Sequence, residues 1–162
     1  MKAYSFRFLF NIVLLGSITF WSCSKSSDTA SQSTASNFTW TQEGKTFTAT
    51  IDTAFLGVGY TFTPFHIIAG FGTFPTSFNR RIDFHLTSFN IGAYTIVPSP
   101  ATVNTLDYID DAGFNLQGIS GTLNITGNAS SLLSGNFSLT LINGAGVTNP
   151  MSGSFSNVSI HP

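Results

Sequence analysis

From residue 38 onward, apolar and polar side chains alternate along the chain with a period of two. The alternation is clearest in five runs, at residues 38–41, 46–51, 81–86, 122–126 and 136–141. Successive side chains of a strand point to opposite faces, so each run predicts a strand with one buried and one solvated face. This pattern is typical of antiparallel sheets whose other face meets water. No window after residue 37 shows helical spacing.

Turn residues interrupt these runs at short intervals, and Glu43-Gly44-Lys45 is the clearest case. Strands that recur at such intervals, about nine or ten here, predict an all-β domain. We expect an antiparallel β-sandwich. A small antiparallel β-barrel is the alternative, because a period of two does not show whether a sheet closes on itself.

Three segments share a Ser-Gly-x-apolar start, at residues 120–123, 134–137 and 152–155. Glycine at the start of a strand permits a bend, so the repeat predicts three successive strands that each turn a corner. After the last copy, Phe155, Val158 and Ile160 cannot all lie on one side of a regular strand. A β-bulge at Ser156-Asn157 would restore the phase.

The N-terminus has the pattern of an export signal. Lys2 and Arg7 accompany an apolar run over residues 8–20. This run is shorter than the roughly 20 residues of a spanning helix and has the length of a signal-peptide core. Cys23 follows this run, and Ser22-Cys23 resembles the lipobox of bacterial lipoproteins. We predict a signal peptide over residues 1–22 and a lipid anchor on Cys23, the alternative being a cleavable signal with an incidental cysteine.

Composition narrows the class of the mature protein. Residues 23–37 are rich in Ser, Thr and Ala, which predicts a flexible tether, and the β domain then spans residues 38–162. Charged residues make up 8% and aromatic residues 14% of the chain. These values argue against disorder, one cysteine excludes a disulfide framework, and six Lys and Arg argue against a nucleic-acid partner.

A family resemblance extends over most of residues 38–160. Gly92, Tyr94 and Ile96 form a G-x-Y-x-I pattern, and apolar-polar strands beginning near Gly121, Gly135 and Gly153 follow it. This order resembles the small β-rich lipoproteins of Bacteroidota that carry a domain of unknown function. The resemblance implies a cell-envelope location at the outer membrane, and it implies no activity, cofactor or catalytic residue.

Charged side chains suggest two weak sites. Arg81, Asp83 and His85 share one strand face and could orient a ligand, although a solvated face with a weak ion pair is the simpler interpretation. Asp107, Asp110 and Asp111 could offer oxygens to calcium, although a hairpin turn is the simpler interpretation.

Other chemistry lacks a motif. His66, His85 and His161 have no zinc-ligand spacing, so we predict no metal and no cofactor. No Gly-x-Ser-x-Gly elbow occurs, and the chain holds a single glutamate, Glu43. We therefore predict that the protein is not an enzyme.

Residues 55–78 are rich in aromatic side chains and broken by Gly and Pro. Phe71, Phe74 and Phe78 lie in its last part, which we expect to be an exposed loop that meets a partner or ligand. The sequence thus predicts a non-catalytic cell-envelope lipoprotein that binds another envelope protein or has a structural role. A carrier of a small apolar or carbohydrate ligand is the alternative, and a hydrolase is a weaker one.

Overall fold

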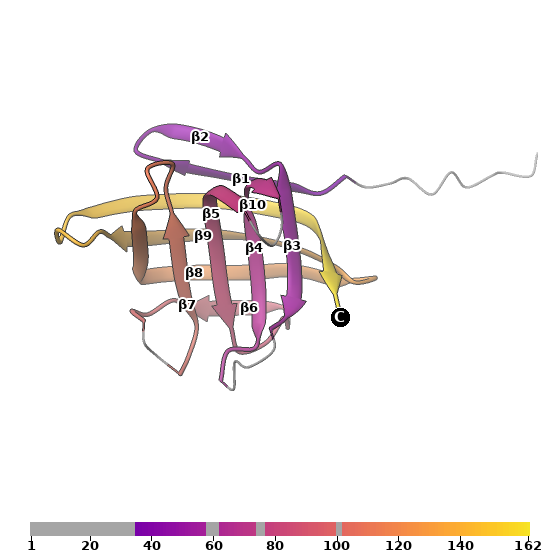
Figure 1. The fold of residues 1–162 in the computed structure, drawn as a ribbon. Coiled ribbons are helices and arrows are strands. Elements are labelled where there is room, and N and C mark those ends of the chain that lie inside the picture. Colours follow the sequence, from indigo (N-terminus) through magenta and orange to yellow (C-terminus); the bar gives the residue numbers. More distant parts are fainter. Residues whose placement is uncertain (1–34, 58–61, 74–76, 100–101) are drawn as a thin grey trace, which may run out of the picture. The chain divides into compact units, whose positions relative to one another are not determined.

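A computed structural model describes residues 35–57, 62–73, 77–99 and 102–162. The signal peptide, Cys23 and residues 24–34 of the tether lie outside these residues. The described residues form ten strands and no helix, which confirms the all-β class and the expected number of strands. The strands are β1 (Asn37–Gln42), β2 (Lys45–Thr48), β3 (Ile51–Leu56), β4 (Phe65–Thr73), β5 (Ser77–Leu86), β6 (Gly92–Thr95), β7 (Thr105–Ile109), β8 (Asn115–Ala129), β9 (Leu132–Ile142) and β10 (Thr148–His161) (Figure 1).

Seven strands pair in a closed ring. Its order is β10-β3-β4-β5-β7-β8-β9 and back to β10, while β1, β2 and β6 pair outside the ring. All pairs in the ring are antiparallel except β10 with β3, which are parallel through Ile160 and His161. The ring makes a β-barrel, so the barrel alternative fits and the sandwich is not confirmed. Closure depends on the last residues of β10 reaching β3, which periodicity does not reveal.

β10 changes partner where it bends. Its first part lies between β1 and β9, and its end turns to run beside β3 (Figure 1, yellow). The register with β9 slips between Phe155 and Val158, and Asn157 has a φ of 56°. The bulge predicted at Ser156-Asn157 is therefore confirmed. Because a bulge bends its strand, this one directs β10 toward the strand that completes the barrel.

The run at residues 46–51 forms parts of two strands instead of one. The Ala49 N–H donates to the Phe38 carbonyl at 2.8 Å, and the Thr50 N–H donates to the Gly70 carbonyl at 3.1 Å. Two consecutive amides thus bond to different strands, β1 and β4. The chain turns a corner here, and the residues before and after the corner face different surroundings.

Aromatic rings fill much of the interior. The rings of Phe38 and Phe155 stack at 5.4 Å, and Phe38 lies 5.8 Å from Phe137. Phe84 meets Phe137 edge-on at 5.1 Å. All four side chains are buried, so the barrel is a packed core.

The three Ser-Gly-x-apolar segments lie in β8, β9 and β10, which form the successive antiparallel strands that the repeat predicted. Their glycines do not sit at strand starts, however. Gly121, Gly135 and Gly153 lie within the strands, where a Cβ atom would approach backbone carbonyl oxygens to 2.3 Å. The glycines are needed for close packing.

No helix in the described ranges is long and apolar enough to pass through a membrane.

Candidate functional site

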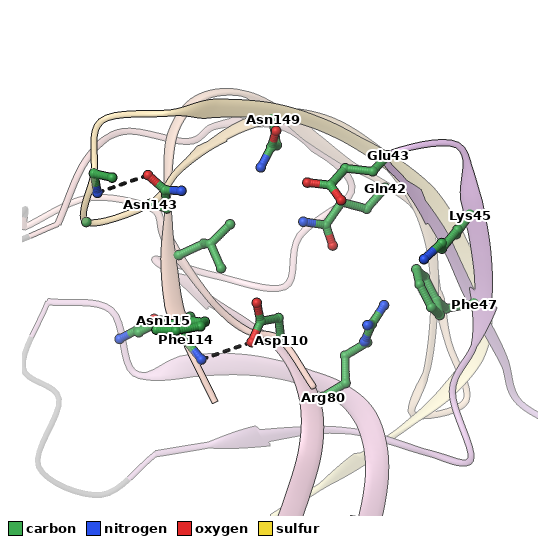
Figure 2. Close-up of a pocket in the computed structure, with 13 residues that line it drawn as sticks. Gln42, Glu43, Lys45, Phe47, Arg80, Asp110, Phe114, Asn115, Asn143 and Asn149 are labelled. Carbon is green, nitrogen blue, oxygen red and sulfur yellow. Dashed lines mark hydrogen bonds between the residues drawn. The ribbon is translucent and has the colours of Figure 1, made fainter. Parts of the chain in front are cut away.

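A pocket opens at one end of the barrel, where the β1–β2, β7–β8 and β9–β10 turns meet (Figure 2). Its volume is about 600 Å³, which lies in the range of roughly 300–1,000 Å³ that is usual for small-molecule sites. Its lining residues are Gln42, Glu43, Lys45, Phe47, Arg80, Asp110, Phe114, Asn115, Leu116, Asn143, Gly144, Ala145 and Asn149.

Asp110 shapes the β7–β8 turn at the rim of this pocket. Its Oδ1 accepts hydrogen bonds from the N–H groups of Ala112 and Phe114, both at 2.9 Å. The Gly113 N–H donates to the Asp110 carbonyl at 3.0 Å, and Gly113 has a φ of 80°. This is a three-residue hairpin loop with glycine in the left-handed region. The loop holds Phe114 at the rim with 67% of its surface exposed.

The β9–β10 turn has the same construction around Asn143. Its Oδ1 accepts from the N–H of Ala145 at 3.0 Å and from that of Val147 at 2.9 Å. The Gly146 N–H donates to the Asn143 carbonyl at 3.0 Å, and the φ of Gly146 is 81°. Asp110 and Asn143 therefore accept equivalent hydrogen bonds at the first position of two matching turns. The carboxamide oxygen of Asn143 is committed to the turn, and its NH₂ group remains a donor.

The three aspartates considered for calcium have separate partners. Asp110 holds the turn, Asp111 pairs with Arg80, and Asp107 lies beside His85. The geometry therefore favours the hairpin alternative over a calcium site.

Arg80 forms one wall of the pocket and is held on two sides. Its Nε donates to Asp111 Oδ1 at 2.8 Å, and its Nη2 donates to the second oxygen of the same carboxylate. Its guanidinium lies 3.8 Å from the centre of the Phe47 ring. A bidentate ion pair and a cation–π contact together restrict its rotamers.

A second polar group of side chains lies on β4, β5 and β7. Arg81, Asp83 and His85 occupy alternate positions of β5. Their side chains lie on the opposite face of the strand from those of the core residues Ile82 and Phe84, as the period of two predicts.

Strand register adds two residues that the sequence reading did not place here. His66 of β4 lies directly opposite His85, and Asp107 of β7 lies directly opposite Asp83. The alternation within each strand shows which face the side chains of His66 and Asp107 occupy. It does not show which residues of the neighbouring strand lie beside them, because that depends on the register between strands.

Asp83 lies between the two histidines. Its Oδ1 is 3.1 Å from His66 Nδ1, and its Oδ2 is 3.5 Å from His85 Nε2. The same His85 nitrogen is 3.4 Å from Asp107 Oδ2. The two imidazole rings have their centres 4.4 Å apart. We call His66, Asp83, His85 and Asp107 the His–Asp cluster.

Interactions within the His–Asp cluster stabilise the charged forms of Asp83 and His85. Burial alone would raise the pKa of Asp83, but hydrogen bonds and charge interactions with His66 and His85 outweigh it and lower that pKa. Burial alone would lower the pKa of His85, but hydrogen bonds and charge interactions with Asp107 and Asp83 raise it to about 9. The simpler interpretation of a solvated face with a weak surface ion pair does not describe this arrangement, since the side chains of Asp83 and His85 are only 10% and 12% exposed.

The expected exposed loop at Phe71, Phe74 and Phe78 is not what the described residues show. Phe71 lies in β4, is half-buried and packs against the core, with its ring 5.8 Å from that of Trp40. Phe78 belongs to β5, where its backbone is opposite Gly72, and its side chain lies outside the described part. Phe74 is also outside the described residues. The exposure predicted for Phe71 is wrong because the strands β4 and β5 extend further than the Gly and Pro residues suggested.

The fold and the pocket define a class, an all-β protein with a closed barrel and a ligand-sized cavity at one end. No protein-family model matches the chain, and comparisons with curated proteins and with solved structures find no match.

Proposed function

We propose that this protein is a non-catalytic cell-envelope lipoprotein whose barrel binds a small, neutral, hydroxyl-rich ligand such as a sugar. The observation that carries the proposal is the pocket of about 600 Å³ at the end of the barrel. It corresponds to the carrier alternative of the sequence reading. The protein-partner interpretation depended on exposed phenylalanine side chains at positions 71, 74 and 78, and the side chain of Phe71 is half-buried.

The charge of the lining supports a neutral ligand. Lys45 and Arg80 contribute two positive charges, and Glu43 and Asp110 contribute two negative charges. The guanidinium of Arg80 is already paired with Asp111. A ligand of either charge would therefore meet a repelling group as well as an attracting one.

The remaining lining groups suit hydroxyl groups and flat apolar surfaces. Gln42, Asn115 and Asn149 carry side-chain amides, which both donate and accept hydrogen bonds, as hydroxyl groups do (Figure 2). Phe114 supplies a ring face on which the C–H face of a sugar ring can pack, whereas the Phe47 ring is already covered by the Arg80 guanidinium. This combination of amides and rings is what distinguishes the proposed ligand class from a purely apolar one.

Isothermal titration of the full chain in detergent against individual monosaccharides and disaccharides tests the proposal. We expect saturable binding of at least one of these sugars. Phe114→Ala should weaken that binding at least tenfold without lowering the free energy of unfolding, because its side chain is 67% exposed.

Phe62→Ala is the matched control, since Phe62 is exposed to a similar degree and does not line the pocket. Its affinity should equal that of the wild type. The proposal fails if no sugar in the panel binds, or if the Phe62 and Phe114 variants lose affinity equally.

A protein partner at the same rim is the second candidate. Phe114 and Val147 occupy equivalent positions in the two matching turns, and both are largely exposed. Paired apolar side chains at a rim are suited to contact another protein surface. Photo-crosslinking from position 114 in cells, with position 62 as the control site, would yield a partner specific to position 114 if this candidate is correct.

We propose that the chain is exported through the signal peptide at residues 1–22 and held in the outer membrane by lipid on Cys23. The lipobox-like Cys23 and the resemblance to Bacteroidota lipoproteins support this location. Several acyl chains on one cysteine anchor a protein without a spanning helix. Cys23→Ala should move the protein from the membrane fraction to the soluble fraction, and continued membrane association would contradict the anchor. Protease treatment of intact cells would then distinguish the surface face from the periplasmic face.

A further inference from the structure

The geometry points to a binding site for a divalent transition-metal ion at His66, Asp83 and His85, for which zinc is the expected occupant. One ligand atom from each of these three side chains lies within 4.8 Å of the others. The site lies on β4 and β5, on the strand face opposite to the core residues, and is separate from the pocket at the end of the barrel.

Two distances in the cluster are close to those between neighbouring ligands of a four-coordinate metal. Zinc binds imidazole nitrogen and carboxylate oxygen at about 2.0–2.2 Å, so neighbouring ligand atoms of a tetrahedral site lie roughly 3.3–3.5 Å apart. The separations are 3.1 Å between His66 Nδ1 and Asp83 Oδ1, and 3.5 Å between His85 Nε2 and Asp83 Oδ2. These two separations involve different oxygens of Asp83, and the three ligand atoms lie within 4.8 Å of one another, so binding draws the two histidine nitrogens closer around one carboxylate.

The fourth position has a candidate in Asp107. Its Oδ2 lies 3.4 Å from His85 Nε2, the nitrogen assigned to the metal. Two imidazole nitrogens with carboxylate oxygens form a donor set that suits zinc and its neighbours in the first transition row and does not suit calcium or magnesium. The side chain of Asp107 is 31% exposed, which leaves the site open to ions from solution.

Strand pairing positions the ligands before any ion arrives. His66 and His85 are directly opposite in the β4–β5 pair, and Asp83 and Asp107 are directly opposite in the β5–β7 pair. Backbone hydrogen bonds of the barrel thus fix all four Cα positions.

The test uses the full chain without a histidine tag, purified in detergent, stripped with EDTA and titrated with Zn²⁺. We expect one zinc per chain by calorimetry and by elemental mass spectrometry. His85→Ala and His66→Ala should each weaken zinc binding at least tenfold. Asp107→Asn should weaken it at least tenfold, because it replaces the carboxylate proposed as the fourth ligand by a neutral amide. Co²⁺ in place of Zn²⁺ should give the intense visible absorption of a tetrahedral nitrogen–oxygen site.

His161→Ala is the matched control, because His161 is the third histidine of the chain and is exposed at the end of β10. It should bind zinc like the wild type. Circular dichroism and thermal unfolding of each variant separate loss of the site from loss of the fold. If the buried His66 position does not tolerate alanine, the Asp107→Asn variant at its partly exposed position still decides the question. The inference is overturned if the wild type takes up no stoichiometric zinc, or if His161→Ala loses as much affinity as His85→Ala.

Discussion

The ring of Phe137 in β9 lies directly over Gly153 in β10. A Cβ atom on Gly153 would lie 2.5 Å from Phe137 Cζ and 2.3 Å from the Thr39 carbonyl oxygen. Phe155 covers Gly135 in the same way, since the register places Gly153 opposite Phe137 and Phe155 opposite Gly135. In both Ser-Gly-x-Phe segments the glycine and the phenylalanine are two residues apart. Antiparallel pairing therefore brings the phenylalanine of each segment over the glycine of the other.

Gly153→Ala should lower the free energy of unfolding by about 1–3 kcal/mol, because the added methyl group meets a backbone oxygen that cannot move freely. Urea unfolding followed by tryptophan fluorescence measures the change. Gly144→Ala is the control, since a Cβ atom there has no neighbour within 4 Å. Equal stability of the Gly153 and Gly144 variants would contradict the packing role of the repeat.

Asn157 supplies the left-handed residue of the bulge that turns β10 toward β3. Its φ is 56°, a conformation that costs most residues about 1–2 kcal/mol. Asn157→Ala should therefore destabilise the protein by about 1 kcal/mol, and Asn157→Val by more, whereas Asn157→Gly should remain within about 0.5 kcal/mol of the wild type. Thermal unfolding of the three variants checks the order. A glycine variant less stable than the valine variant would argue against a conformational cause.

Asp110 should stabilise its turn through one carboxylate oxygen. Asp110→Ala removes the acceptor of the Ala112 and Phe114 N–H groups and should cost about 1 kcal/mol. Asp110→Asn keeps an oxygen in that position, as Asn143 does in the matching turn, and should be close to the wild type. Hydrogen exchange of the two amides checks the local effect. If both variants exchange at the wild-type rate, the carboxylate does not hold the turn.

Tyr94 of the G-x-Y-x-I pattern is a structural residue. It is buried, and its hydroxyl donates to the Asn90 carbonyl at 2.6 Å and lies 2.8 Å from Ser88 Oγ. Tyr94→Phe leaves both partners without this hydroxyl and should lower the free energy of unfolding by about 1–2 kcal/mol in chemical denaturation. Ser88→Ala removes a smaller part of the network and should cost less. A Tyr94→Phe variant as stable as the wild type would mean that water replaces the hydroxyl at no cost.

Local patterns in the sequence were sufficient for several features. The alternation of residues 81–86 correctly separated the core residue Phe84 from the outward group of Asp83 and His85. The phase slip after Phe155 correctly located the bulge at Asn157. These features depend on neighbouring residues of one strand, whose side chains alternate by covalent geometry.

Local patterns failed where a partner strand decides the outcome. Residues 46–51 alternate without a break, yet the chain turns at Ala49 because the next amide bonds to β4 instead of β1. Phe71 lies between two glycines that suggested a loop, but pairing with Arg80 extends β4 through it.

The sequence by itself therefore determined the all-β class, the faces of several strands, the turn at Glu43-Gly44 and the bulge in β10, because each follows from the geometry of a few consecutive residues. Only the tertiary structure decided that the sheet closes, that the turns of Asp110 and Asn143 meet around one pocket, and that His66 and Asp107 join Asp83 and His85. The physical reason is that these relationships depend on register between strands. If β4 paired one residue out of register, the side chain of His66 would lie on the opposite face of the sheet, although the local sequence would be unchanged.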